Sequence, residues 1–114
     1  MTPDQLIEQL KQHPVAFSQV MAVIDAHYHF TPSRFSNGQQ INAAGENNGS
    51  CKIFAFARLH QLDEQTTLNA FGDFYTQDVL QHPDATDHQN IRQFMQHGWS
   101  VIEFETQPLN ARAE

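Results

Sequence analysis

The chain has 114 residues, of which 39% are hydrophobic, and its formal net charge is −7. This length suits one domain with a single core, and nine phenylalanines supply the apolar surface that disordered chains lack. The negative charge disfavours nucleic acid and anionic lipid as partners. The single cysteine excludes an internal disulfide. The sequence shows neither a secretory signal nor an apolar span, so we expect a cytoplasmic location and no membrane partner.

Two helices are expected first. Residues 2–5, Thr-Pro-Asp-Gln, form a capping-box pattern with proline at the first helical position, and apolar residues follow until Pro14. The next segment carries apolar residues at helical spacing: Phe17, Met21, Ile24 and Tyr28. It predicts a helix that stops before Thr31.

Histidines at positions 27 and 29, following Asp25, have the spacing of a metal motif. On a strand, two side chains at this spacing share one face, whereas near the end of a helix they diverge. Because this segment is expected to be helical, we predict no metal site here and no bound cofactor.

Residues 31–50 are rich in glycine and asparagine, which predicts irregular structure with a tight turn at Asn37-Gly38. Loops of this length in small domains are often functional. From residue 50 to Leu62 the apolar density rises, and alanines accompany the large side chains. This pattern predicts a helix that is enclosed on most sides and capped by Ser50.

The second half of the chain predicts two more helices and a strand. Apolar residues recur after Asp63 at spacings of three and four, namely Leu68, Phe71, Tyr75 and Val79. A second capping-box pattern at residues 86–89 opens a helix that Gly98 ends. Residues 99–104 are typical of a strand, with residues 35–41 as the nearest partner, and the tail from Pro108 is expected to fray. The predicted fold is mainly α (α+β), with about five helices around one core and a small two-stranded β element near residues 35–41 and 99–104.

Cys51 has two interpretations. With Ser50 as the cap, the thiol lies in a first helical turn, where the helix dipole and Lys52 favour the nucleophilic thiolate. His88, expected in another first turn, is then the candidate base, and this Cys-His pair forms the candidate catalytic site. The alternative is structural, because free cysteine is commonly buried and would pack beside Ile53 and Phe54.

The loop before Cys51 is also a candidate binding site. Residues 45–52 resemble a phosphate loop, but the spacing of the glycines and the lysine does not match one. Basic and polar residues of this region could nevertheless line a pocket for a small polar or anionic ligand, namely Arg34, Asn37, Asn42, Glu46, Asn47, Ser50, Lys52 and Arg92. The alternative is that the three cations are unrelated surface charges.

Four segments in this order resemble the HopJ family of bacterial type III effectors: HFTPSRFSNG, NAAGENNGSCKIFAFARL, TLNAFGDFYTQDVL and DHQNIRQFMQHGWSVIEF. The resemblance covers nearly the whole chain and implies one HopJ-like domain over residues 1–114. It also implies delivery into a host cell by a type III secretion apparatus, which would then be a partner. The resemblance implies no defined activity, so no catalytic residue follows from it.

Two classes of function remain open. In the first, the protein binds an unknown protein or a small ligand through its polar loop without turnover. In the second, it is a small cytosolic enzyme for acyl transfer or hydrolysis that uses Cys51 and His88.

Overall fold

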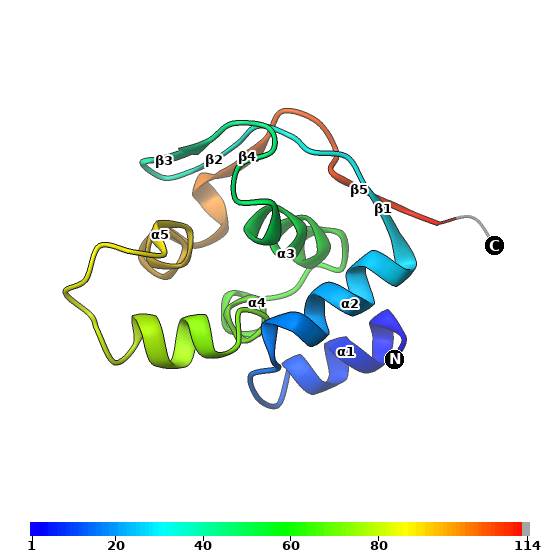
Figure 1. Ribbon diagram of the computed structural model, residues 1–114, viewed down its shortest axis with the longest axis horizontal. Helices are drawn as coiled ribbons and strands as arrows, with labels where there is room; N and C mark the ends of the chain where they lie inside the picture. Colours follow the sequence, from blue (N-terminus) through cyan, green and yellow to red (C-terminus); the bar gives the residue numbers. More distant parts are fainter. Residues whose placement is uncertain (113–114) are drawn as a thin grey trace.

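The computed structural model describes residues 1–112. Figure 1 shows the elements in space. In chain order they are α1 (Pro3–Leu10), α2 (Phe17–His27), β1 (Tyr28–Phe30), β2 (Phe35–Asn37), β3 (Gln40–Asn42), α3 (Asn48–Leu59), α4 (Glu64–Asn69), the π-helix η1 (Phe74–Val79), α5 (Gln89–His97), the 3₁₀ helix η2 (Gly98–Val101), β4 (Ile102–Phe104) and β5 (Leu109–Ala111). The fold is α+β and mainly helical, as predicted.

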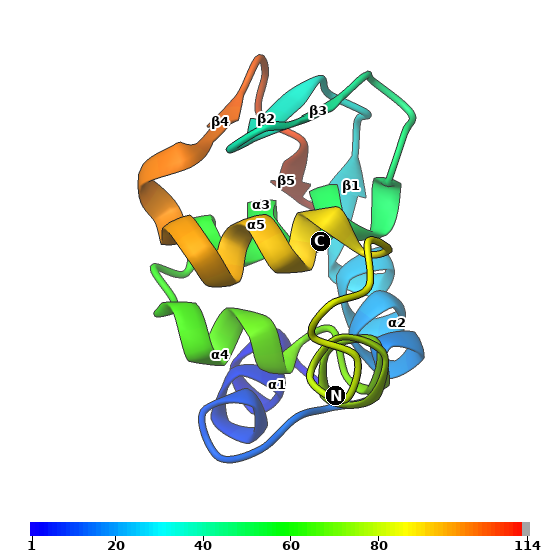
Figure 2. The same ribbon diagram turned by 90° about the vertical axis from the view of Figure 1, so that its left-hand side faces the viewer.

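The elements form layers around α3 (Figure 2). A sheet of β3, β2 and β4 lies at one end, α3 and α5 lie next to it, and α1, α2 and α4 lie at the other end. Helix α3 is enclosed, as its apolar sequence predicted, and its buried side chains are Cys51, Ile53, Phe54, Ala55, Phe56 and Ala57. Its alanines are small enough to let neighbouring helices approach, and its phenylalanines fill the space between them.

The capping box of α1 is confirmed. The Gln5 backbone N–H donates to Thr2 Oγ1 at 3.1 Å, and the Thr2 backbone N–H donates to Gln5 Oε1 at 2.9 Å. The second expected capping box is wrong. Helix α5 begins at Gln89, its N-cap residue is His88, and the Gln89 side chain donates to the Thr86 carbonyl instead.

The apolar stripe after Asp63 belongs to two helices. Asp63 caps α4, but the chain turns at Gly72 before η1 begins. Gly72 has a φ of +56°, and a Cβ there would lie 2.7 Å from the carbonyl oxygen of Val15. Only glycine combines this φ with so close an approach. Leu68, Phe71, Tyr75 and Val79 are all buried, so the periodicity located core positions without locating the break.

The predicted pairing of residues 35–41 with 99–104 is confirmed, and the sheet is larger than expected. Strand β2 pairs antiparallel with β4, with Phe35 opposite Phe104. The tight turn expected at Asn37-Gly38 is the turn of the hairpin β2–β3, in which Gly38 has a φ of +60°. Strand β3 is the additional strand of this sheet. Residues 98–101 form η2 rather than the start of a strand.

The tail was expected to fray from Pro108, and this is wrong for residues 109–111, while residues 113 and 114 lie outside the described part of the chain. Strand β5 pairs antiparallel with β1, and Leu109 is fully buried against the core. The same pairing corrects the expectation for the two histidines, because His27 ends α2 while His29 lies in β1. Among residues 1–112, no group of three or more His, Cys, Asp or Glu side chains is placed to hold a metal ion.

No helix in the described part of the chain is long and apolar enough to cross a membrane.

Candidate functional site

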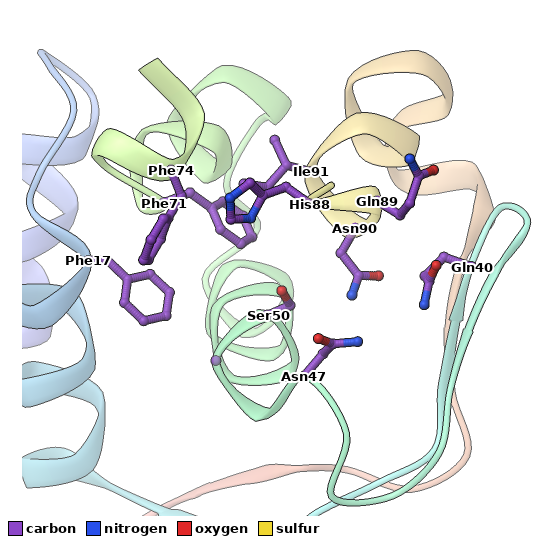
Figure 3. A pocket seen from close by; sticks show the side chains of 11 residues that line it. Phe17, Gln40, Asn47, Ser50, Phe71, Phe74, His88, Gln89, Asn90 and Ile91 are labelled. Carbon is purple, nitrogen blue, oxygen red and sulfur yellow. The ribbon is translucent and has the colours of Figure 1, made fainter. Parts of the chain in front are cut away.

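A hollow of about 410 Å³ lies where α3 and α5 both begin, beside the start of α2, the segment that leads into η1, and the β2–β3 hairpin (Figure 3). We call it the two-helix pocket. It is lined by Phe17, Gln40, Asn47, Gly49, Ser50, Phe71, Phe74, His88, Gln89, Asn90 and Ile91. Its volume falls in the range of small-molecule sites, which is about 300–1,000 Å³.

Both helices begin at the pocket without a side-chain cap. The N-cap residues are Asn47, with a φ of 51°, and His88, with a φ of 50°, and neither side chain accepts a hydrogen bond from its own helix. The first-turn N–H groups of a helix have no partner within the helix, and here those of residues 48–50 and 89–90 remain for water or a ligand, whereas the Ile91 N–H donates to the His88 carbonyl at 3.0 Å. The positive ends of two helix dipoles also meet at this place. Positive φ is uncommon outside glycine, although asparagine and histidine adopt it more readily than most residues.

Aromatic rings form one side of the two-helix pocket (Figure 3). The Phe17 and Phe74 rings meet edge to face at 5.0 Å between centroids, and the His88 ring lies against Phe74 at 5.3 Å. Phe74 is 40% exposed although it is a large apolar side chain. Gly49 makes room for this arrangement, since a Cβ on it would lie 2.5 Å from Phe17 Cζ.

Side-chain amides form the opposite side, and Asn42 is the centre of their network. Asn42 is fully buried, and its Oδ1 accepts from Asn47 Nδ2 at 2.7 Å and from Asn90 Nδ2 at 2.9 Å. A longer bond of 3.4 Å comes from Gln40 Nε2. Asn42 Nδ2 donates to the Phe35 carbonyl at 3.3 Å and to Asn90 Oδ1 at 3.2 Å. Asn42 therefore holds three pocket residues from beneath.

Asn37 extends this network below the pocket. It is fully buried, and its Nδ2 donates to the Asn90 carbonyl at 2.7 Å and to Asn90 Oδ1 at 3.2 Å. Its Oδ1 is the buried side-chain atom without a hydrogen-bond partner in the described part of the chain. Turning the amide over would place this oxygen against two other oxygens, so the network fixes its orientation.

His88 is held by an acid of the π-helix. Its Nε2 lies 3.0 Å from Asp78 Oδ2 and 3.9 Å from Asp87 Oδ2. A carboxylate accepts, so the ring nitrogen donates, and in a neutral ring the other nitrogen is then an acceptor. Asp87 also pairs with Arg92 at 2.7 Å, and this hydrogen bond lowers the pKa of the Asp87 carboxyl.

The structure does not bring the three predicted cations together at the pocket. Lys52 pairs with Asp25 at 2.8 Å and lies over the Phe30 ring, while Arg92 is engaged by Asp87 outside the pocket. Arg34 is exposed and does not line the pocket. Glu46 folds back, and its Oε1 accepts from the Ala43 N–H at 2.8 Å. Of the predicted ligand-binding residues, Asn47 and Ser50 line the pocket, and Asn37 and Asn42 lie in the network beneath it.

Cys51 lies in the core and does not line the pocket that contains His88. Its side chain is 1% exposed, and burial raises the pKa of the thiol to about 11, although a backbone hydrogen bond from Ser33 opposes the shift. This is opposite to the lowered pKa expected at a helix start. Ser50 is not the cap but the third residue of α3, so Cys51 is the fourth residue of the helix and lies three positions further along than expected. Desolvation there outweighs the helix dipole.

The sequence reasoning missed the aromatic side and Asn90. Phe17 and Phe71 were counted as core positions because they recur at helical spacing, and Phe74 lies outside that stripe. Asn90 directly follows residues 86–89, which were interpreted as a capping box, and it was not considered as a site residue. One feature of the sequence could have indicated the amide network. Asparagines recur near the predicted turns and helix starts, where side-chain amides commonly bond to the backbone, namely Asn37, Asn42, Asn47 and Asn90.

Two comparisons place the chain among known proteins. The sequence profile described as "HopJ type III effector protein" matches residues 3–109.

The chain belongs to the HopJ type III effector family.

A solved structure, titled "Crystal structure of unknown function protein VPA0580", is 52% identical in sequence to this HopJ protein. The similarity covers 96% of this chain and 92% of that one, with a TM-score of 0.93. No curated protein matches the chain. These likenesses establish the family and the fold, and they indicate no substrate or ligand.

Proposed function

We propose that this HopJ protein is a binding protein whose two-helix pocket holds a small polar ligand. The observation that carries the proposal is the meeting of two uncapped helix starts in one hollow, with aromatic rings on one side and a buried amide network on the other. Buried amides that hydrogen-bond to one another hold each other in place, and in this network Asn37 Oδ1 is the buried atom left without a partner among residues 1–112. This network keeps the polar residues of the pocket in place before a ligand arrives, which lowers the entropy cost of binding.

The geometry gives no support to the alternative of an enzyme built on Cys51 and His88. The thiol is enclosed by the core, and its raised pKa keeps it protonated near neutral pH, whereas a nucleophilic cysteine is a thiolate. His88 lines the two-helix pocket and Cys51 does not, so the two side chains are not paired there. Binding without turnover therefore fits the arrangement best.

A fragment screen by ¹⁵N–¹H correlation NMR tests the proposal. We expect small polar fragments that contain a ring to shift the backbone amides of residues 47–50 and 88–91. The variant Phe74→Ala should weaken this binding about tenfold, while Leu80→Ala should not, because Leu80 is comparably exposed but does not line the pocket. Shifts confined to other surfaces, or equal binding by both variants, would contradict the proposal.

We also propose that the protein is made in the bacterial cytoplasm and passes through a type III secretion apparatus into a host cell, where it binds its ligand. The family description supports this route. A fusion of residues 1–30 to a reporter enzyme tests it, with a strain that lacks a functional apparatus as the control. Translocation that depends on the apparatus is expected, and its absence would count against an effector role for this chain.

A further inference from the structure

The donor and acceptor atoms of the two-helix pocket that have no partner in the protein determine which ligand groups can bind there. Asn47 Nδ2 is used by Asn42 Oδ1 at 2.7 Å, and Asn47 Oδ1 has no hydrogen bond within residues 1–112. Turning the amide of Asn47 over would set its oxygen against that of Asn42, whose orientation is fixed by Asn90 Nδ2 at 2.9 Å. Asn47 therefore offers its carbonyl oxygen, an acceptor that requires an N–H or O–H donor on the ligand.

Donors lie close to this acceptor. The first turn of α3 begins at the next residue, and no side chain caps it. Its N–H groups require acceptors on the ligand, such as carbonyl oxygens. The start of α3 therefore presents an acceptor beside donors, which is complementary to an N–H group beside a C=O group.

Charge argues against a simple anion. Among residues 1–112, no lysine or arginine lines the pocket, and the carboxylates of Asp78 and Asp87 lie 3.0 Å and 3.9 Å from His88 Nε2. A phosphate or carboxylate would meet the two helix starts but also the oxygen of Asn47, with no paired cation in a chain of net charge −7. A neutral ligand avoids both conflicts.

The aromatic side adds a preference for a flat ligand, because rings stack or meet edge to face on Phe17 and Phe74. We propose that the two-helix pocket binds a neutral planar lactam or imide ring. Its N–H donates to Asn47 Oδ1, and the adjacent carbonyl accepts from the first turn of α3. This inference rests on the proposed function and names the ligand class for the same site.

Uracil is the probe, because it carries imide and lactam N–H groups beside carbonyls on one flat ring. In NMR titrations we expect uracil to shift the amides of residues 48–50. The compound 1,3-dimethyluracil keeps the ring and carbonyls but lacks both N–H groups, and it should bind about tenfold more weakly. Uridine keeps the imide N–H and is titrated in parallel, since the ring could come from a free base or a nucleoside. Binding of either one supports the proposal and indicates the source.

The variant Asn47→Gly isolates the acceptor. Glycine adopts the φ of 51° without strain, so the variant removes the amide while keeping the turn. It should reduce uracil binding to the level of 1,3-dimethyluracil. Asn48→Ala is the matched control, because Asn48 is also exposed but does not line the pocket, and it should bind uracil as the parent protein does.

Two results would overturn the ligand class: equal binding of uracil and 1,3-dimethyluracil, or binding of sodium benzoate with none of uracil or uridine. In the second case the pocket still binds a ligand, so the proposed function survives while this inference fails. If no fragment of the wider screen shifts the pocket amides, the proposed function itself fails.

Discussion

Replacing Asn42 with alanine tests whether the amide network holds the two-helix pocket together. Asn42 is fully buried, and the change removes the acceptor of Asn90 Nδ2 as well as a donor to the Phe35 carbonyl. Asn90 is 6% exposed, so water reaches its amide poorly. A buried polar group left without a partner costs about 1–3 kcal/mol. Asn47 and Gln40 are more exposed, so water can replace their bonds at little cost.

We therefore expect Asn42→Ala to lower the free energy of unfolding by about 2–4 kcal/mol, measured by urea denaturation with an unchanged slope. Gln40→Ala is the control and should cost less than about 0.5 kcal/mol, because Gln40 is half-buried and its bond to Asn42 is long. A loss below about 1 kcal/mol for Asn42→Ala would show that water satisfies Asn90 and would refute the reasoning.

Two other predictions concern the core. The Cys51 thiol should react with alkylating reagents near neutral pH only after denaturation. Because its folded pKa of about 11 lies above the ordinary value of 9.0, the stability that the buried neutral thiol contributes is complete below pH 9 and should fall by about 2–3 kcal/mol as the pH rises to 11. Cys51→Ala should lack this part of the pH dependence, and fast alkylation of the native protein would contradict the burial. Gly72→Ala should lower the free energy of unfolding by about 2–4 kcal/mol, because it adds both a strained φ and a clash with the Val15 carbonyl. The control Gly45→Ala also has a positive φ but no atom within 4 Å of the new Cβ, and it should cost about 1 kcal/mol. Equal losses of the two variants in thermal or urea unfolding would mean that a backbone shift relieves the clash.

Periodicity and capping chemistry predicted the helical part of the fold because both act within a few residues of chain. The capping box at Thr2 and the glycine that ends helix α5, Gly98, were identified correctly for this reason. The strand β5 was missed because Leu109 is a single apolar residue, and its burial depends on pairing with β1 about 80 residues earlier. Such long-range pairing leaves a weak local signal.

The site was predicted in part. The polar loop indicated Asn37, Asn42, Asn47 and Ser50 as site residues. Which side chains these residues bond to depended on the tertiary structure and could not be predicted. Lys52 and Arg92 were placed in the pocket because they stand near helix starts, and the structure pairs them with Asp25 and Asp87 instead. Phe74 could not be recognised as a pocket residue from sequence, because an exposed and a buried phenylalanine look the same in an apolar segment.

The most direct test of the binding pocket is a crystallographic fragment screen of the protein. We expect bound fragments to gather in the two-helix pocket, with polar atoms within hydrogen-bond distance of the N–H groups of residues 48–50 and a ring against Phe17 or Phe74. Fragments that bind only elsewhere, for example in the groove lined by Val79, Leu80 and Met95, would contradict it.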